Sequence, residues 1–360
     1  MVDLRLVVVS SVFVFIVELI LRGECIIAYD RLAVAYDYPY LCMVQYRDYK
    51  PKDPTVYIPV SACSIFTTKY VVTSADNLIR NISNDPNSPN YRPFYKDVGK
   101  LQVYGGQYQL HITGNEQIRE EWRKTTQFRF VTSITFCKDH NRLLDATAMS
   151  DSTVYGEANP DSMNDFFFHN NGRMMFGLAF IEIDDPLVWS PYVLPIPIYN
   201  ILESENFDQS ANIFARLDRN PYSEATCTLA GFGSGTGLMV TLKMVYVPKN
   251  HCIAAYCSED MENCLNYPLQ WYHVCFRSRT YSDACRLDQG APLYCWWWDR
   301  AVIAILTGAE YCGFQGLPGV YTVIPAVVSF YNKAVRAEAL RDRNRPRKGE
   351  IFTTSTLRPP

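Results

Sequence analysis

Short segments in which hydrophobic and polar residues alternate recur along the chain, and they predict strands rather than helices. Tyr38–Tyr46 and Ile58–Phe66 are rich in β-branched and aromatic residues and are expected to form the first two long strands. Ala301–Gly308 is a continuous apolar run that fits a buried strand. Helical spacing begins only near Pro325, after which apolar residues recur on one face: Val327, Val328, Tyr331, Val335 and Leu340. The pattern predicts a chain built mainly of strands that ends in a helix over residues 325–340.

The N-terminus has the pattern of a secretory signal peptide. Arg5 precedes an apolar run, Leu6–Val17, that is too short to span a bilayer comfortably. Gly23 and Cys25 are small residues placed for signal peptidase, so residues 1–25 are expected to be removed. A membrane anchor is the alternative, and charged residues close behind the apolar run weigh against it. The mature protein is therefore predicted to be secreted and extracellular, with no membrane attachment.

Composition agrees with secretion and excludes one class of partner. The chain has 360 residues, 12 cysteines and a formal net charge of −3, which gives no reason to expect nucleic acid. Asn81 begins an Asn-Ile-Ser glycosylation sequon in polar surroundings. Residues 341–360 form a basic, Pro- and Thr-rich tail that is expected to be disordered, with binding to an acidic partner as the alternative.

Two long polar stretches interrupt the strands. Lys138–Arg173 contains several Asn-Pro, Asp-Ser and Asn-Gly turn signals, and loops of this length are usually functional or disordered. Pro195–Ser223 is interpreted as the connection between two halves of the chain.

One stretch carries a catalytic motif with its chemistry removed. Asp283–Leu293 resembles the nucleophile loop of trypsin-like serine proteases, whose pattern is D-x-C-x-G-D-S-G-G-P-L. Gln289 stands where that family has its nucleophilic serine, and Leu287 replaces the glycine whose N–H helps to form the oxyanion hole. The resemblance implies the scaffold of an acyl-transfer site without the group that attacks the peptide.

The other two members of the catalytic triad are also replaced. Val71–Asn77 resembles the family segment V-V-T-A-A-H-C, with Asp76 at the position of the general base. The cysteine after that base is Asn77, and its partner cysteine aligns with Ser61, so both ends of one family disulfide are missing together. Phe176–Ile183 resembles the family's D-I-A-L-L-K-L strand, with Gly177 in place of the orienting aspartate.

The resemblance to trypsin-like serine proteases implies an all-β fold of two six-stranded antiparallel barrels with a C-terminal helix. Cys227–Gly233 and Leu317–Thr322 resemble two further motifs of the family and occur in its order. The implied S1-like peptidase domain covers residues 26–340. Its parts are a first barrel over about residues 26–200, a second barrel over about residues 224–324, and the helix at 325–340.

The resemblance also implies a disulfide framework. Its family pairs are Cys227–Cys295, Cys252–Cys275 and Cys285–Cys312. Two further pairs are suggested by position in the chain, Cys257–Cys264 within one loop and Cys42–Cys63 between neighbouring strands. Either Cys25 is retained and pairs with Cys137, or Cys137 is a free or intermolecular thiol. His251 and His273 lack the spacing of a zinc site, so no metal or cofactor is expected.

Two other functional features survive in the alignment. Asp283 aligns with the aspartate at the base of the primary specificity pocket, and Gly308 and Gly319 align with the glycines that line it. Leu306 and Thr307 replace the serine and tryptophan that flank a substrate chain in that family, which favours ancestry over use of the pocket. If signal cleavage exposes Ile26, its amino group is expected to pair with Asp288; the alternative is an ordinary strand residue.

The sequence therefore predicts a secreted serine protease homologue without peptidase activity, similar to those that arthropods encode. Its expected role is to bind a secreted protein, such as an active protease or its substrate, in an extracellular proteolytic or reproductive pathway. The alternatives are an endopeptidase with an atypical site and a purely structural secreted component. No other histidine stands in a motif that would replace the missing base.

Overall fold

The protein is described by a computed structural model. The structure describes residues 31–32, 37–50, 53–107, 124–139, 142–145, 177–198, 206–219, 227–232, 237–259, 269, 271–278, 283–296, 301–309 and 317–332. The predicted signal peptide, most of Lys138–Arg173 and the basic tail lie outside these ranges.

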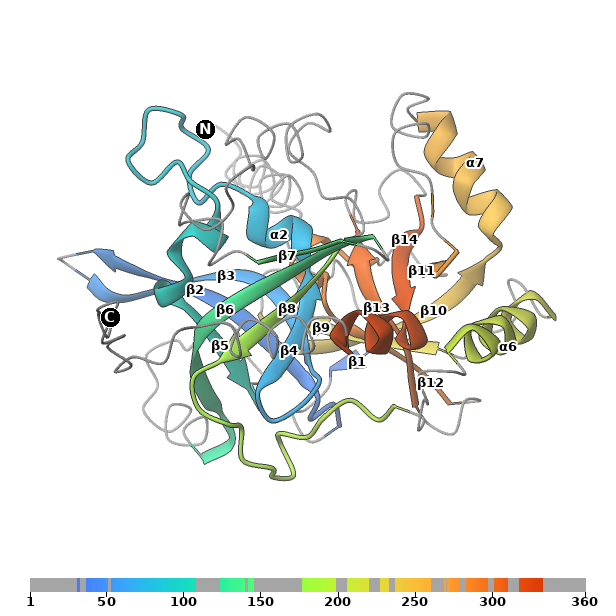
Figure 1. Cartoon of the computed structure of the whole chain (residues 1–360), viewed down its shortest axis with the longest axis horizontal. Helices are drawn as coiled ribbons and strands as arrows, with labels where there is room; N and C mark the ends of the chain where they lie inside the picture. Colours follow the sequence, from blue (N-terminus) through green and yellow to red (C-terminus); the bar gives the residue numbers. More distant parts are fainter. Residues whose placement is uncertain are drawn as a thin grey trace, which may run out of the picture.

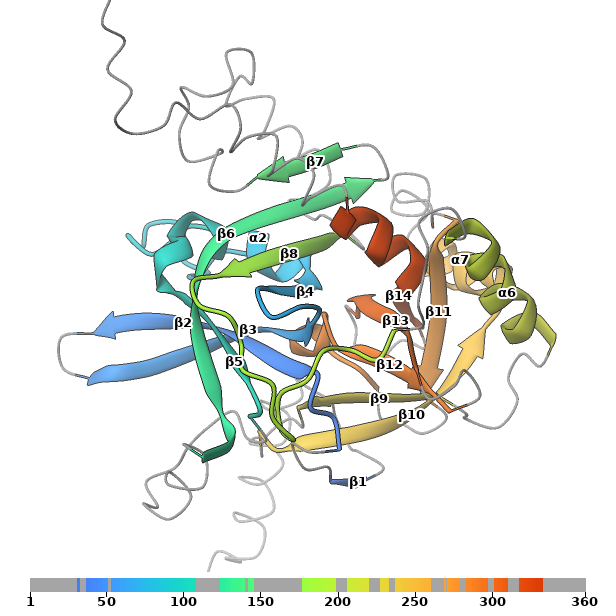
Figure 2. The ribbon, with the colours of Figure 1, turned by 60° about the horizontal axis from the view of Figure 1, so that its bottom comes forward.

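The first half of the chain forms a closed antiparallel barrel (Figures 1 and 2). Six strands pair in the order β5-β2-β3-β4-β8-β6, and a pairing between β5 and β6 closes the ring. A short seventh strand continues the sheet beyond β6. The strands are β2 (Leu41–Lys50), β3 (Asp53–Ile65), β4 (Tyr70–Ser74), β5 (Leu101–Gly105), β6 (Gln127–Asp139), β7 (Arg142–Asp145) and β8 (Leu178–Ile183).

The second half repeats this architecture. Its ring follows the order β10-β11-β14-β13-β12-β9 and is closed by a pairing between β9 and β10. The strands are β9 (Cys227–Phe232), β10 (Met239–Val247), β11 (His273–Ser278), β12 (Pro292–Cys295), β13 (Ala301–Gly308) and β14 (Gly319–Val323). Two closed six-stranded barrels are the trypsin-like fold, so the predicted fold class is confirmed.

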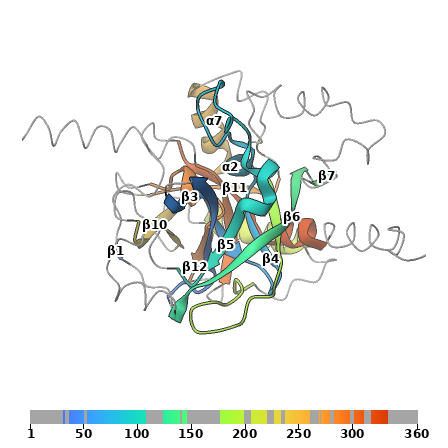
Figure 3. The same cartoon turned by 90° about the vertical axis from the view of Figure 1, so that its left-hand side faces the viewer.

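The barrels share a continuous apolar contact. One hydrophobic cluster fills the first barrel, around Ile65, Phe136 and Ile181. A second fills the other barrel and extends to Met43 and Phe180 of the first. All eight positions of β13 are buried, as expected for the continuous apolar run in its sequence. Figure 3 views the molecule from the side of the first barrel.

A helix over residues 324–332 follows the last strand, where the helical spacing predicts one. Its Tyr331 ring packs against Phe66, Tyr70 and Phe180, with ring centroids 4.7, 5.4 and 5.7 Å away. These aromatic residues belong to the first barrel, so the helix leaves one barrel and is fixed on the other. Residues 333–340 of the predicted helix lie outside the described residues.

The structure departs from the sequence-based expectations at three places. β7 lies within Lys138–Arg173, which was expected to be a loop. β1 (Arg31–Leu32) pairs with β10, so these early residues join the sheet of the second barrel, although the first barrel was expected to begin at residue 26. The expected connection Pro195–Ser223 contains a helix, α6 (Asn206–Arg219), in which Ile213 and Leu217 are buried. The remaining helical segments are α2 (Ala75–Ile79), η1 (Phe94–Lys100), α7 (Lys249–Glu259) and η3 (Arg286–Asp288).

Three of the five anticipated disulfides are present between described residues. They are Cys42–Cys63, Cys227–Cys295 and Cys252–Cys275. Cys257 and Cys285 are also disulfide-bonded, and their anticipated partners, Cys264 and Cys312, lie outside the described residues. Cys25 is outside them as well, and Cys137 is described by its backbone in β6. No helix within the described part of the chain is long and apolar enough to cross a membrane.

Candidate functional site

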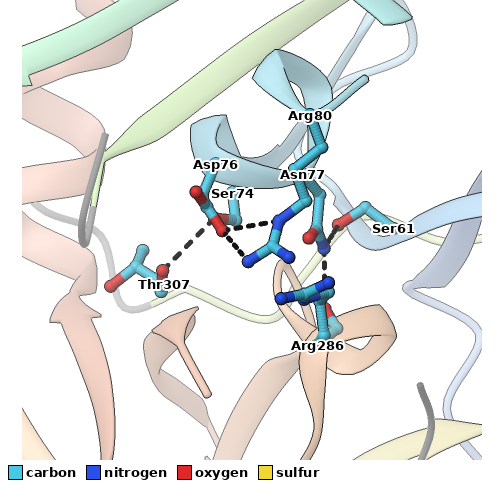
Figure 4. A network of polar contacts seen from close by, with 7 residues as sticks. All are labelled: Ser61, Ser74, Asp76, Asn77, Arg80, Arg286 and Thr307. Atoms are coloured by element: carbon cyan, nitrogen blue, oxygen red, sulfur yellow. Dashed lines mark hydrogen bonds and ion pairs between the residues drawn. The ribbon is translucent and has the colours of Figure 1, made fainter. Parts of the chain in front are cut away.

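The positions expected to form the degenerate triad lie where the two barrels meet; Figure 4 shows Asp76 there, with Asn77 beside Arg286 of the second barrel. Asp76 is in α2, at the end of β4, and Gly177 lies directly before β8. The Ala75 N–H donates to the Gly177 carbonyl at 2.9 Å, which joins these two segments. Gln289 follows η3 in the second barrel, and its carbonyl accepts from Ser61 of β3 at 2.6 Å. The fold therefore gathers segments separated by more than 200 residues around one site.

Asp76 is tied to a neighbouring cation. Its Oδ2 accepts from Arg80 Nε at 3.0 Å and from Arg80 Nη2 at 2.6 Å, an i,i+4 ion pair. Only 3% of Asp76 is exposed. Its other oxygen, Oδ1, is buried without a hydrogen-bond partner. Both guanidinium donors converge on Oδ2, so this oxygen is engaged with Arg80 and is not available to a neighbouring nucleophile.

Gln289 is buried and its main chain is fully engaged. Only 1% of the residue is exposed, and its side-chain Oε1 has no hydrogen-bond partner. Its backbone N–H donates to the Arg286 carbonyl at 3.2 Å. The next residue, Gly290, has φ +94°, and an added Cβ would collide with the Ala62 carbonyl and with Thr73. Glycine is therefore required where this loop turns against the first barrel.

The oxyanion position is rearranged. Arg286–Asp288 forms a 3-10 turn that includes Leu287, at the position of the family's glycine. The N–H of Gln289 is one of the two donors expected to point at a substrate oxyanion, and here it is bonded inside the turn. Leu287 is buried, with 7% of its surface exposed. In this conformation the loop does not offer the pair of free N–H groups that acyl transfer needs.

Ser61 and Asn77, the positions of the missing family disulfide, are in direct contact. Asn77 Nδ2 donates to Ser61 Oγ at 3.0 Å and also to the Arg286 carbonyl at 2.6 Å. Both residues are buried, Ser61 completely. A polar bridge thus stands where the alignment implies a covalent one, and it extends to the second barrel. The sequence drew attention to these two positions because both expected cysteines are missing together. It gave no sign of the contact between Asn77 and Arg286.

Asp283, the residue that aligns with the base of the family's specificity pocket, is buried. It is 6% exposed, and burial raises its pKa to about 7, against the opposing effects of the Ala284 N–H and the charge of Arg277. The Ala284 N–H donates to Asp283 Oδ1 at 2.8 Å. Nearby, the Tyr321 hydroxyl is fully buried without a hydrogen-bond partner, and burial together with the Asp283 charge raises its pKa.

The strand expected to border a substrate is covered. Gly308 pairs with Val320, next to Gly319, so the two pocket glycines are brought to adjacent strands. Leu306 and Thr307, expected to flank a substrate chain, are both completely buried. Thr307 Oγ1 donates to the Val320 carbonyl at 3.2 Å, and its own carbonyl accepts from Ser74 Oγ at 3.2 Å. A bound peptide would have to displace these contacts to reach the strand.

Asp288 is completely buried, and its carboxylate is held by the main chain. Its Oδ1 accepts from the Phe232 N–H at 3.1 Å and its Oδ2 from the Cys285 N–H at 2.9 Å. Its expected partner Ile26 lies outside the described residues. Asn81, the glycosylation candidate, is exposed in a short bridge to Pro93.

Within the described ranges, no three His, Cys, Asp or Glu side chains gather closely enough to bind a metal ion. The described histidines are His251 in α7 and His273 in β11, so neither belongs to the elements that carry Asp76, Gly177 and Gln289. Within the described residues, the site is a set of hydrogen bonds between the two barrels. The ion pair between Asp76 and the partly exposed Arg80 lies beside it.

Comparison with known protein families finds no match for this chain. Among solved structures, the chain is similar to neuropsin, a serine protease expressed in the limbic system of mouse brain. The identity is 15%, the TM-score 0.48, and the match covers 86% of this chain and 99% of that one. It is also similar to a mutant of human heparin binding protein (CAP37), with 15% identity, a TM-score of 0.47, and coverage of 85% and 95%. The double-barrel fold itself follows from the strand pairings.

Proposed function

We propose that this protein is a non-catalytic, secreted serine protease homologue that acts by binding another extracellular protein. The observation that carries the proposal is the state of Gln289. Its side chain is a carboxamide, which cannot be deprotonated at neutral pH, and its N–H is bonded to the Arg286 carbonyl. Position 289 therefore has no group that could attack a peptide. Its N–H, one of the two expected oxyanion donors, is already engaged.

Among the described residues near Gln289, we find no substitute for the missing base. Asp76 is paired with Arg80, and Gly177 contributes only a carbonyl, which accepts from Ala75. Ser61 has a hydroxyl near Gln289, but it is completely buried and donates to the Gln289 carbonyl. Loss of the nucleophile or base alone costs about six orders of magnitude in rate in a serine protease.

The test of inactivity uses the purified protein and two kinds of probe. The protein should not cleave peptide substrates that carry Arg, Lys, an aromatic residue or a small residue at the cleavage position. A fluorophosphonate probe should label none of its serines. Stoichiometric labelling of any serine would overturn the proposal. The triple variant Asp76→His, Gly177→Asp, Gln289→Ser is expected to stay far below a normal protease, because the 3-10 turn still uses the N–H of residue 289.

Binding is proposed because the features that keep the fold are retained while those for catalysis are replaced. Loops on a rigid scaffold are where binding surfaces are usually built. The polar segment Lys138–Arg173 is our first candidate surface, and the basic segment Arg341–Lys348 is the second. An active secreted protease or its substrate is the partner we would seek first.

Affinity capture from the native secreted fluid should recover a specific partner with the intact protein. A variant that lacks residues 146–173 should lose that partner and keep its thermal transition. Unchanged capture by this variant would move the surface to the basic tail, and absence of any specific partner would favour a purely structural component. The structure offers no observation that favours the other alternative, an atypical endopeptidase.

A further inference from the structure

The residues 286–290, here called the 286–290 loop, are held from the first barrel by side chains that donate to their carbonyls. Asn77 donates to Arg286 at 2.6 Å, Ser61 to Gln289 at 2.6 Å, and Ser64 to Gly290 at 2.8 Å. All three donors are buried. Hydrogen bonds are stronger where access to water is low, so these bonds hold the orientation of each carbonyl, although Arg286 itself is only half-buried.

The Arg286 carbonyl is the key contact, because it accepts two donors at once. Gln289 N–H reaches it from within the turn at 3.2 Å, and Asn77 Nδ2 reaches it from the first barrel at 2.6 Å. The carbonyl of Arg286 and the N–H of Leu287 belong to one planar peptide and point in opposite directions. By holding the Arg286 carbonyl, Asn77 makes the Leu287 N–H point away from the Asn77 side chain. It also keeps the bond between the Gln289 N–H and the Arg286 carbonyl in place.

Asn77 is itself positioned by Ser61. An amide nitrogen has two hydrogens, and both are used: one on Ser61 Oγ at 3.0 Å, the other on the Arg286 carbonyl. Figure 4 shows the Asn77 amide between Ser61 and Arg286, on the side of α2 that faces the second barrel. A disulfide between these two positions would join α2 to β3 but would leave the Arg286 carbonyl without this donor.

We propose that Ser61 and Asn77 form a latch between the barrels that holds the 286–290 loop in its closed turn. The latch is a conformational device distinct from the replaced triad, and it does not depend on the binding role proposed above. It implies that a ligand can engage the main chain of this loop only after Asn77 has released Arg286.

Hydrogen–deuterium exchange, read at single amides, tests the latch. In Asn77→Ala the Gln289 amide should exchange about tenfold faster, because a hydrogen bond that supports its acceptor has been lost. Amides that pair β9 with β10 should keep their wild-type rates and serve as the internal reference. The matched control is Asn84→Ala, which removes an exposed asparagine and should match wild type throughout. Unchanged exchange at Gln289, or acceleration only together with β9–β10, would overturn the proposal.

A second variant separates the latch from general stabilisation and remains informative if Asn77→Ala does not fold. In Ser61→Cys/Asn77→Cys a disulfide is expected because the alignment places a disulfide of trypsin-like proteases at these two positions, so the protein should melt no lower than wild type. Its Gln289 amide should nevertheless exchange faster than in wild type. If the bridged variant protects Gln289 as well as wild type does, Asn77 is not the latch.

Discussion

Asp283 is a buried carboxyl group that the fold holds at a cost, and replacing it should make the protein more stable. Burial raises its pKa from 3.8 to about 7, while the Ala284 N–H and Arg277 act in the opposite direction. In the folded state the protonated form is therefore favoured relative to the unfolded chain. The contribution of Asp283 to the free energy of unfolding is therefore most favourable below its pKa in the unfolded chain. That contribution is lost as the pH rises from about 4 to about 7.

The size of the effect follows from the shift. A change of about three units, at 1.36 kcal/mol per unit, corresponds to about 4 kcal/mol between pH 4 and pH 8. Asp283→Asn removes the charge and keeps an oxygen for the Ala284 N–H, which donates to Asp283 Oδ1 at 2.8 Å. The variant should match wild type near pH 4 and exceed it by about 4 kcal/mol at pH 8.

Urea unfolding at several pH values between 4 and 8 measures the difference directly. The control is Asp185→Asn, which removes an exposed carboxylate and should leave the pH dependence of wild type unchanged. Parallel pH profiles for wild type and Asp283→Asn would show that Asp283 is not the titrating group, and the reasoning from burial would then be wrong.

Three further predictions concern single positions. Arg80→Met leaves the Asp76 carboxylate without its cation and should lower the free energy of unfolding by about 2 kcal/mol. The loss should be smaller than for a fully buried ion pair because Arg80 is partly exposed. Adding Asp76→Asn should recover most of the loss, as measured in a double-mutant cycle. Gly290→Ala should cost at least about 3 kcal/mol or prevent folding, whereas Gly99→Ala, with open space around the new Cβ, should melt like wild type. Protein from a secretory host should lose the mass of one N-glycan in Asn81→Gln; equal masses would show that the exposed sequon is unused.

Several strands could be predicted from strong local signals, whereas the two barrels were implied by the resemblance to trypsin-like serine proteases. β13 is a continuous apolar run, and the second barrel is further marked by cysteines and glycines in a recognisable order. α6 was missed because its segment is mainly polar. The signal it did carry is Ile213 and Leu217, four residues apart, which are buried while most other described positions of the helix are exposed. A short apolar pair inside a polar stretch is too weak to distinguish a helix from a loop.

At the site, the sequence singled out Asp76, Gly177 and Gln289 but could not give their conformation. The turn at Arg286–Asp288 depends on Asn77, more than 200 positions earlier in the chain, and no local pattern encodes such a contact. The burial of Leu306 and Thr307 has the same origin. The Ser74 hydroxyl of the first barrel bonds the Thr307 carbonyl only once the two barrels have met.

The hydrogen bonds of Gln289 and Asn77 to the Arg286 carbonyl lead us to expect that a serine at position 289 alone would not create an active protease. In a protease the loop must leave the N–H groups before and at the nucleophile free for the oxyanion. Here the N–H of Gln289 satisfies the Arg286 carbonyl, and Asn77 reinforces that carbonyl from the other barrel. A serine placed at position 289 would keep this main-chain bond, because the bond does not involve the side chain. Opening the turn would require a change at Asn77 as well, and it would leave the half-buried Arg286 carbonyl in need of a new donor.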